Sequence, residues 1–249
     1  MSDRNIKLTI EYDGTHYHGW QIQRNAATIQ GFIQNALTKI TQTETQIVGA
    51  GRTDTGVHAS GQVANFHTHA QMSPAALQKA VNALLPSDIV IIGAAEVSPD
   101  FHARFSASSR TYRYTILNRV YPSAFLRNRA YFLPRPTINV DSANAVCRAL
   151  IGNHDCSSFQ RTGGGRANPV CDIYESRCWK EEDLVHFEIE ADAFLRGMVR
   201  AIAGTILKLH DAASPVDQFR KILEARDRSA AGASAPAYGL CLTRVKYDL

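Results

Sequence analysis

The spacing of hydrophobic and polar positions divides the first hundred residues into short strands and helices. Residues 7–12 alternate between apolar and polar side chains, which predicts a strand. Thr28 is a candidate helix N-cap, and the apolar positions that follow it at helical spacing are Ile29, Phe32, Ile33, Ala36, Leu37 and Ile40. Ser73-Pro74 predicts a second helix start. Further strands are predicted at 45–51, 62–66 and 89–97. The resulting order, β-α-β-β-α-β, is typical of ferredoxin-like sheets.

The second half of the chain predicts similar elements. Strands are expected at 109–117, 173–180, 185–191 and 240–247, and helices at 141–151, 194–209 and 215–225, the first of them capped by Asp141. The composition of 161–169 and of 229–239, rich in small residues, predicts loops there. We therefore expect an α+β protein with two domains, residues 1–105 and 106–249.

The composition excludes several classes of protein. Of the 249 residues, 45% are hydrophobic and 20% are charged, which is typical of a globular chain and not of a disordered one. The longest mostly apolar stretch, 89–95, is much shorter than the roughly 20 residues needed to span a bilayer. The polar start contains no apolar segment of a secretory signal. Five cysteines without a CxxC pair indicate reduced thiols. We expect a cytoplasmic protein.

Positive charge is concentrated in one segment. The net charge is +4, but residues 101–140 contain seven arginines and no acidic residue. Aromatic residues are interleaved with these arginines: Phe101, Phe105, Tyr112, Tyr114, Tyr121, Phe125, Tyr131 and Phe132. Rings that stack on bases and guanidinium groups that bind phosphates are typical of proteins that bind looped or single-stranded RNA. The alternative is a solvated basic surface above core aromatics.

The densest cluster of polar residues and glycines is 49–59, which contains Arg52 and Asp54. Glycines allow sharp turns and close approach of a substrate, and an ionised carboxylate can act as nucleophile or base. The alternative is a β-turn with a structural Arg–Asp pair. Neither the histidines at 16 and 18 nor those at 67 and 69 have a third ligand at metal spacing, and no motif marks a nucleotide cofactor. We expect chemistry without metal or cofactor.

Seven sequence blocks carry a resemblance to a known family. They are EYDGxxYxGWQxQ from Glu11, AGRTDxGVHAxGQV from Ala50, FHAR from Phe101, RTYRY from Arg110, GxHD from Gly152, FLxxMVR from Phe194 and YGL from Tyr238. In this order they resemble the TruA family of tRNA pseudouridine synthases over nearly the whole chain. The GRTDxGVHA block is highly specific.

The resemblance implies an isomerase (an intramolecular transferase) that converts uridine to pseudouridine in the anticodon stem-loop of tRNA, at tRNA positions 38, 39 and 40. It implies no metal and no cofactor, and a homodimer. The implied fold has two ferredoxin-like or RRM-like α+β subdomains with a central antiparallel sheet and a basic cleft. Residues 1–105 would carry the catalytic loop, and 106–249 would complete the cleft and the tRNA-binding surface.

Residue roles follow from the same resemblance. Asp54 matches the catalytic nucleophile, and Arg52 matches the arginine that pairs with it and fills the gap left by a flipped base. Tyr112 matches a tyrosine that stacks on the target base, and Leu240 an apolar residue of the uracil pocket. Further candidate tRNA contacts are His58, Arg104, Arg110, Arg127 and Arg129. The chain departs from the family pattern at Cys156, Cys171 and Gly197, where the family usually has Phe, Arg and Asn respectively.

Several alternatives stay open at this stage. Asp54 could attack C1′ or C6, or remove a C2′ proton to give a glycal, and Tyr112 or Asp54 itself could take the C5 proton. A catalytically silent RNA-binding protein would also explain the basic-aromatic segment, although it has no need of Asp54. A glycoside or nucleoside hydrolase would need a second carboxylate, for which Glu44 and Asp13 are available.

Overall fold

The computed structural model describes residues 3–163 and 168–248, and these divide into two compact units. Unit 1 consists of Met1–Ser108 and Leu242–Leu249, and unit 2 of Ser109–Cys241. Both units combine helices with mostly antiparallel strands, which confirms the α+β class. Part of the predicted loop at 161–169 lies outside the described residues. No helix in the described ranges is long and apolar enough to cross a bilayer.

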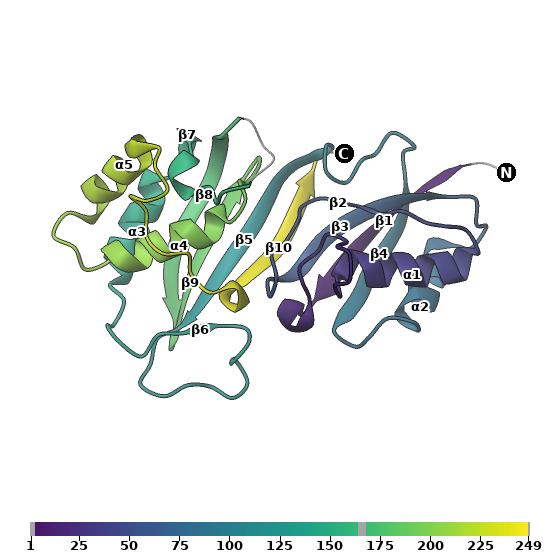
Figure 1. Ribbon diagram of the computed structural model, residues 1–249, viewed down its shortest axis with the longest axis horizontal. Coiled ribbons are helices and arrows are strands. Elements are labelled where there is room, and N and C mark those ends of the chain that lie inside the picture. Colours follow the sequence, from purple (N-terminus) through teal and green to yellow (C-terminus); the bar gives the residue numbers. More distant parts are fainter. Residues whose placement is uncertain (1–2, 164–167, 249) are drawn as a thin grey trace. The chain divides into compact units, whose positions relative to one another are not determined.

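Unit 1 has the predicted β-α-β-β-α-β order (Figure 1). Its elements are β1 (Arg4–Tyr12), the one-turn 3-10 helix η1 (Gly14–His16), α1 (Ile29–Thr41), β2 (Val48–Gly49), β3 (His58–Thr68), α2 (Pro74–Asn82) and β4 (Ile89–Val97). The strand order is β4-β1-β3, β2 also pairs with β3, and all these pairs are antiparallel. This order confirms the split arrangement expected from the sequence.

The starts of the two helices in unit 1 also match the sequence. Thr28 Oγ1 accepts a hydrogen bond from the Gly31 N–H, and Ser73 Oγ accepts one from the Ala76 N–H. Each cap satisfies a backbone donor that the first helical turn leaves without a partner. The predicted strand at 45–51 is much shorter than expected, because only Val48–Gly49 pairs with β3.

The strand β10 (Leu240–Tyr247) completes unit 1 although it comes from the end of the chain. It follows β3 in the strand order, and Gly61 of β3 lies so close to it that a Cβ there would be 2.3 Å from the Thr243 carbonyl oxygen. Val245 and Tyr247 pack against the buried residues Phe101 and Ala103. The Tyr247 hydroxyl also donates to the Ala103 carbonyl at 2.8 Å. The terminal strand is therefore part of the core of this unit.

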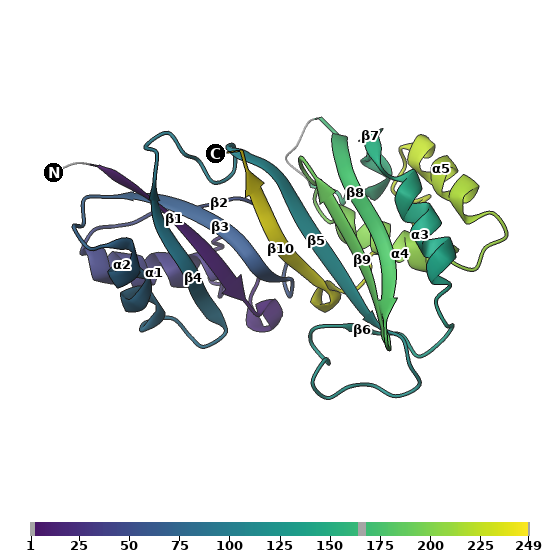
Figure 2. The same cartoon turned by 180° about the vertical axis from the view of Figure 1, so that it is seen from behind.

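The described part of unit 2 contains three α-helices beside a second set of strands. Its elements are β5 (Ala107–Leu117), β6 (Tyr131–Phe132), α3 (Val140–Ala149), β7 (Gly152–Asp155), η2 (Ser157–Phe159), β8 (Val170–Glu181), β9 (Leu184–Ala191), α4 (Met198–Leu209), α5 (Pro215–Ala225) and η3 (Ala237–Gly239). The strand order is β5-β9-β8-β7, with β6 parallel to β5. Figure 2 shows the face of β8 and β9 that has no helix in front of it.

Two helix starts in unit 2 differ from the predictions. The helix expected from 194 begins at Met198, because Gly197 has a φ of 71° and interrupts the helical backbone. The helix expected to be capped by Asp141 begins at Val140, since the Asn139 side chain accepts from the Ser142 N–H and forms the cap. Asp141 instead lies in the first turn, where its negative charge interacts favourably with the helix dipole.

The segment 229–239, predicted as a loop, packs closely on α4. The Gly232 N–H donates to Thr205 Oγ1 at 2.9 Å, and a Cβ on Gly204 would lie 1.8 Å from the Ala233 carbonyl oxygen. The Ala235 N–H donates a hydrogen bond to the Arg200 carbonyl, and the Arg200 guanidinium donates one to the Ala235 carbonyl. The small residues therefore permit backbone contact with a helix, and they do not mark a solvated linker.

Candidate active site

The loop that carries Asp54 connects β2 to β3 and is held by several hydrogen bonds. The Val57 N–H donates to the Asp54 carbonyl at 3.1 Å, which closes a turn, and Gly56 in this turn has a φ of 76°. The Gln62 amide, fully buried, donates to the Gly51 carbonyl at 2.8 Å. Thr53 Oγ1 shares a hydrogen bond of 2.8 Å with the Tyr12 hydroxyl. The backbone on both sides of the half-buried Asp54 is therefore fixed.

The first sequence block forms the support of this loop. A Cβ on Gly14 would lie 2.0 Å from the Val57 carbonyl oxygen, and one on Gly19 would lie 2.4 Å from that of Thr53. Gly19 also has a φ of 84°, a region that side chains rarely adopt. The Trp20 N–H donates to the Thr53 carbonyl at 3.1 Å. No separate role for these three residues was predicted from the sequence, and their contacts explain why this block accompanies the GRTD block.

Arg52 and Asp54 lie on the same loop but in different surroundings. The Arg52 side chain is exposed, and among the described residues it forms no ion pair with Asp54. Asp54 has interactions of its own in the folded chain. The pairing of Arg52 with Asp54, and its entry into the gap left by a flipped base, stay predictions.

His58 is buried at the start of β3, with 7% of its surface exposed. Its Nδ1 accepts a hydrogen bond from the Gly14 N–H at 3.1 Å and lies 3.2 Å from Asp13 Oδ1. In the neutral ring this arrangement places the proton on Nε2. The imidazole therefore joins η1 to β3, and it has little surface with which to contact RNA.

The two candidates for the second carboxylate of a glycosidase, Asp13 and Glu44, lie in different surroundings. Asp13 Oδ1 accepts hydrogen bonds from both the backbone N–H and the hydroxyl of Thr15. Glu44 is exposed in the connection between α1 and β2. Across the described ranges, no three His, Cys, Asp or Glu side chains form a group that could hold a metal ion.

Tyr112 and Leu240 belong to unit 2. Tyr112 lies on β5 with 7% of its surface exposed, and its ring meets the Phe194 ring edge-on with 5.0 Å between centroids. On the same face of β5, Tyr114 is fully buried, and its hydroxyl donates to the Pro236 carbonyl at 2.9 Å. Burial raises the pKa of the Tyr114 hydroxyl well above its usual range. Leu240, buried, begins β10 directly after η3, where Gly239 lies against the Tyr114 ring.

The structure separates the basic-aromatic segment into core and surface residues. Phe101, Tyr112 and Tyr114 are buried, whereas Phe105, Tyr121 and Phe125 are 76%, 77% and 95% exposed. The buried rings agree with the alternative interpretation of core aromatics, and RNA binding by the exposed rings stays a prediction. The exposed rings are the ones that remain accessible to a base.

The candidate arginines differ in the same way. The Arg104 guanidinium lies 5.4 Å from the centroid of the exposed Phe105 ring. Arg127 and Arg129 are exposed on the loop between β5 and β6, beside the exposed Phe125. Arg110 is half-buried and donates to the Asp192 carbonyl at 2.7 Å. Arg104, Arg127 and Arg129 therefore lie on the surface, while Arg110 also supports the turn after β9.

Comparison with known proteins identifies the family. A family model described as tRNA pseudouridine synthase matches residues 8–106 and 146–248. A tRNA pseudouridine synthase A from Thermoanaerobacter sp. (strain X514) is 41% identical over 244 residues, 98% of this chain and 100% of the relative. One from Ruminiclostridium cellulolyticum is 44% identical over 250 residues, with the same coverage. A solved Cbf5-Nop10-Gar1 complex is far more distant, with 12% identity and a TM-score of 0.37, over 95% of this chain and 57% of that chain.

The family model covers most of the chain, and the relatives align with it from end to end. Both agree with the resemblance carried by the sequence blocks. The chain therefore belongs to the tRNA pseudouridine synthase family, whose members are isomerases that convert uridine in tRNA to pseudouridine.

Proposed function

We propose that this isomerase modifies uridines at positions 38, 39 and 40 of the tRNA anticodon stem-loop, with Asp54 as its catalytic carboxylate. The observation that carries the proposal is the fixed GRTD loop, in which Thr53 is bound by Tyr12 and Trp20 and the turn after Asp54 is closed by Val57. A carboxylate in a preorganised backbone avoids the cost of reordering during the reaction. A β-turn with only a structural role would not need so many supports on both sides.

The reaction itself balances without a further reagent. The N1–C1′ bond breaks, the uracil rotates, and a C5–C1′ bond forms, while the proton from C5 is lost and N1 gains one. An ionised carboxylate can stabilise the sugar as the first bond breaks, by attack at C1′. Attack at C6, or removal of a C2′ proton to give a glycal, would use the same group.

The other residues are assigned to binding and positioning. Tyr112 would stack on the target uracil, Leu240 would contact its edge, and Arg52 would fill the space that the flipped base leaves. Extrusion of a base costs a few kcal/mol of stacking, which contacts with aromatic rings offset. The side chain of Arg52 is exposed, as a residue that enters such a space must be. The Tyr112 ring is buried against Phe194, so stacking on the uracil requires this ring to become accessible when tRNA binds.

The tRNA backbone would contact the exposed arginines. Arg127 and Arg129 combine with Phe125 on the loop between β5 and β6, and Arg104 lies beside Phe105. Each group offers a cation for phosphate and a ring for an unpaired base. Arg110 would contribute charge at the start of β5, whereas the burial of His58 makes a direct contact there a poor assignment.

We also propose a homodimer located in the cytoplasm. The tRNA substrate supports this location, and so do the five cysteines, which form no disulfide, since oxidising conditions favour disulfides. The homodimer rests on the family resemblance. Light scattering of the purified full chain measures the mass of the protein in solution. A mass of one chain across micromolar concentrations would refute the homodimer.

The test of the catalytic proposal is tritium release from tRNA labelled at C5 of uridine. Five transcripts are compared: one with uridine at 38, 39 and 40, three with a single uridine retained among these positions, and one with cytidine at all three. We expect release from the uridines at these positions, and none with Asp54→Asn. Release that persists when all three positions are cytidine would contradict the proposed site, and no release from any tRNA would favour a silent RNA-binding protein.

A further inference from the structure

The loop that follows η1 lies directly against the backbone of the proposed catalytic residue. This loop, residues 18–27, is the flanking loop. A Cβ on Gly19 would be 3.1 Å from the carbonyl carbon of Asp54, and the Trp20 N–H donates to the Thr53 carbonyl at 3.1 Å. All of these residues belong to unit 1. The flanking loop is therefore close to any nucleotide on which Asp54 acts.

The flanking loop is held by hydrogen bonds at its ends and along its length. The His18 N–H donates to the Ala27 carbonyl at 2.8 Å and joins the two ends. The buried Gln30 accepts a hydrogen bond from the Ile22 N–H at 3.0 Å through Oε1. The Gln23 amide donates back to the His18 carbonyl at 2.8 Å. The side chains of this loop are therefore presented from a well-supported backbone.

Gln21 has an amide group that the fold does not use. Its side chain is half-buried, and among the described residues it forms no hydrogen bond. By contrast, the amides of Gln23 and Gln30 both have partners. The Cα of Gln21 is at most roughly 9 Å from the Thr53 carbonyl oxygen, because the preceding residue, Trp20, donates to this oxygen. The Gln21 amide is thus available to a substrate beside the catalytic loop.

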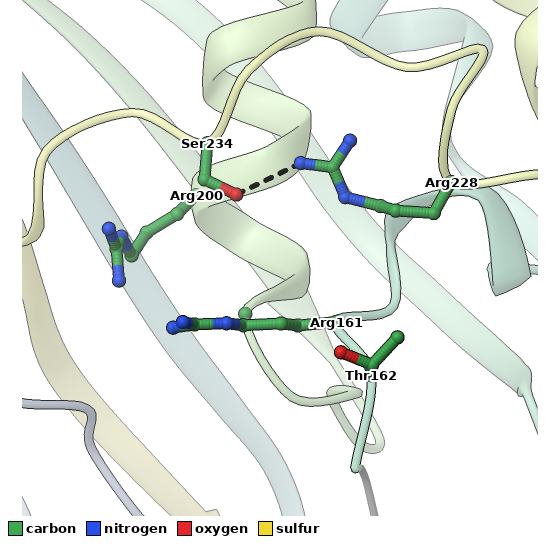
Figure 3. Close-up of a pocket in the computed structure, with 6 residues that line it drawn as sticks. Arg161, Thr162, Arg200, Arg228 and Ser234 are labelled. Carbon is green, nitrogen blue, oxygen red and sulfur yellow. Dashed lines mark hydrogen bonds between the residues drawn. The ribbon is translucent and has the colours of Figure 1, made fainter.

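The Arg24 side chain is also not used by the fold. It is exposed in the middle of the flanking loop, and across the described ranges its guanidinium forms no hydrogen bond or ion pair. Arginines that support the fold differ from it. In a pocket of unit 2, for example, Arg228 donates to Ser234 Oγ at 3.1 Å and to the Gly232 carbonyl at 3.0 Å (Figure 3). The charge of Arg24 is therefore accessible to a ligand.

The chemistry of the flanking loop matches an RNA backbone. From residue 14 to residue 43 the sequence contains no Asp or Glu, so no acidic side chain of this segment competes for Arg24. Guanidinium groups suit phosphate, and phosphate contacts fix the register of a nucleic acid without reading its sequence. The ribose 2′-hydroxyl is both a donor and an acceptor, and so is the amide of Gln21. The two side chains therefore offer one partner for each polar group of the RNA backbone.

We propose that the flanking loop binds the tRNA strand next to the target uridine, with the Gln21 amide at a ribose 2′-hydroxyl and the Arg24 guanidinium at a phosphate. This inference deepens the proposed function and rests on it. The two contacts hold the neighbouring nucleotide while the target base leaves its stack, so extrusion moves one nucleotide and not the strand. Gln21 and Arg24 bind the RNA, and they take no part in the bond changes.

The contact of Gln21 is tested with tRNA assembled from synthetic halves that carry single 2′-deoxy substitutions along the anticodon stem-loop. Binding is measured for the wild-type enzyme, Gln21→Ala and the control Gln218→Ala, which removes an exposed glutamine of α5. We expect one position next to the target uridine at which the substitution weakens wild-type and Gln218→Ala binding roughly threefold to tenfold, as for one lost hydrogen bond. At that position, Gln21→Ala should bind both tRNAs equally.

The contact of Arg24 is tested through the salt dependence of binding. Arg24→Ala should lower the slope of log affinity against log salt by about 0.7–0.9, because one phosphate is no longer neutralised. The control, Arg220→Ala, removes an exposed arginine of α5 and should leave the slope unchanged. Since neither Gln21 nor Arg24 has a side-chain hydrogen bond within the described part of the chain, both variants should unfold at the urea concentration of the wild type.

The outcomes separate this inference from the proposed function. The 2′-hydroxyl contact is refuted if Gln21→Ala remains as sensitive as the wild type to every 2′-deoxy substitution, or if no substitution near the target matters. An unchanged salt slope for Arg24→Ala refutes the phosphate contact. These results come from binding and do not depend on turnover. An absence of tritium release from positions 38, 39 and 40 would refute the target positions alone, and a 2′-deoxy effect lost in Gln21→Ala would still support the contact of the flanking loop with RNA.

Discussion

The indole ring of Trp20 lies so close to Gly49 that a Cβ at position 49 would be 2.5 Å from Trp20 Nε1. Trp20 is 1% exposed, so its ring has no free space into which to move. Gly49 ends β2, directly before the GRTD loop, and Trp20 also binds the Thr53 carbonyl through its backbone. The two residues together set the distance between the first sequence block and the proposed catalytic loop.

The first prediction follows from this contact. Gly49→Ala should lower the free energy of unfolding by about 1–3 kcal/mol, because it overpacks a filled site, and it should reduce turnover through a shift of the loop. Gly93→Ala is the matched control, since a Cβ there would lie 3.6 Å from Thr9, an ordinary contact. Urea unfolding and tritium release measure both effects. Trp20→Phe should partly rescue Gly49→Ala, and a strictly additive double variant would contradict the model of direct contact.

The second prediction concerns Asp54. Asp54→Asn keeps the shape of the side chain and removes its charge, so we expect turnover to be abolished while tRNA binding survives. The removal of a negative charge next to RNA phosphates should leave the affinity equal or slightly higher. Filter binding and tritium release are measured on the same preparation. Pseudouridine formed by the variant above the level of wild-type contamination would remove Asp54 as the essential group.

The third prediction separates the ring of Tyr112 from its hydroxyl. Tyr112→Phe should bind tRNA normally, because the ring and its packing against Phe194 are retained. If the hydroxyl takes the C5 proton, this variant loses turnover after glycosidic cleavage. Tyr112→Leu should lose binding as well, since base stacking is worth about 1–3 kcal/mol. Single-turnover kinetics decide the matter, and near wild-type rates for Tyr112→Phe would restrict Tyr112 to stacking.

Tyr114→Phe is the control for the loss of a hydroxyl on the same strand face. Its hydroxyl donates to the Pro236 carbonyl, so the substitution removes one buried hydrogen bond. We expect a loss of about 1 kcal/mol in stability. A selective loss of turnover equal to that of Tyr112→Phe would show that the assay responds to general damage of the strand.

The fourth prediction tests the surface arginines. Arg127→Ala combined with Arg129→Ala should weaken tRNA binding and lower the slope of log affinity against log salt by about 0.7–0.9 for each phosphate that the protein no longer neutralises. The control pair, Arg148→Ala with Arg220→Ala, removes exposed arginines from α3 and α5. Titrations at several salt concentrations give the slopes. An equal slope for the two double variants would place the RNA away from the loop between β5 and β6.

The fifth prediction concerns Glu188, which faces Arg113 of β5 and Arg177 of β8 across the strands of unit 2. Burial alone would raise the pKa of Glu188, but hydrogen bonds from Arg177 and Arg113 outweigh it and hold the pKa below its usual range. A lowered pKa in the folded state stabilises the protein above the unfolded pKa, and this stabilisation is lost as the pH falls through the folded pKa.

Glu188→Gln should therefore cost about 1–2 kcal/mol at neutral pH, and the difference from wild type should diminish as the pH falls below about 4.5. Glu224→Gln, on the exposed side of α5, is the control. Thermal unfolding across this pH range provides the measurement. A difference that is constant with pH would exclude ionisation of Glu188 as the cause.

The parts of the fold that depend on neighbouring residues could be predicted from the sequence. The caps Thr28 and Ser73 act within their own first helical turn, and the strand over 89–97 is marked by its own apolar residues. Glu188 could not be assigned in this way, because its partners lie 11 and 75 residues away along the chain. For the same reason, the contacts by which Gly14 and Gly19 support the GRTD loop could not be predicted from the sequence.

For the candidate site, the sequence indicated the residue types but not which of them are buried. Composition could not distinguish Tyr114, which is fully buried, from Phe105, which is 76% exposed, since both lie in the same basic segment. At Gly197, the departure from the family's asparagine is explained by the backbone. Its φ of 71° lies in the left-handed region, which glycine and asparagine adopt more readily than other residues. The substitution therefore preserves the turn before α4.

The place of β10 has a consequence for synthesis on the ribosome. Unit 1 holds the proposed catalytic loop, yet Val245 and Tyr247 of its core are translated only after the whole of unit 2. After Ser108 has been made, roughly 130 further residues must follow, which takes roughly 7–27 s at about 5–20 residues per second. During this interval unit 2 can complete its own core, while the part of β3 around Gly61 lacks its partner strand β10. The unit whose sequence begins first is thus the one that finishes folding last.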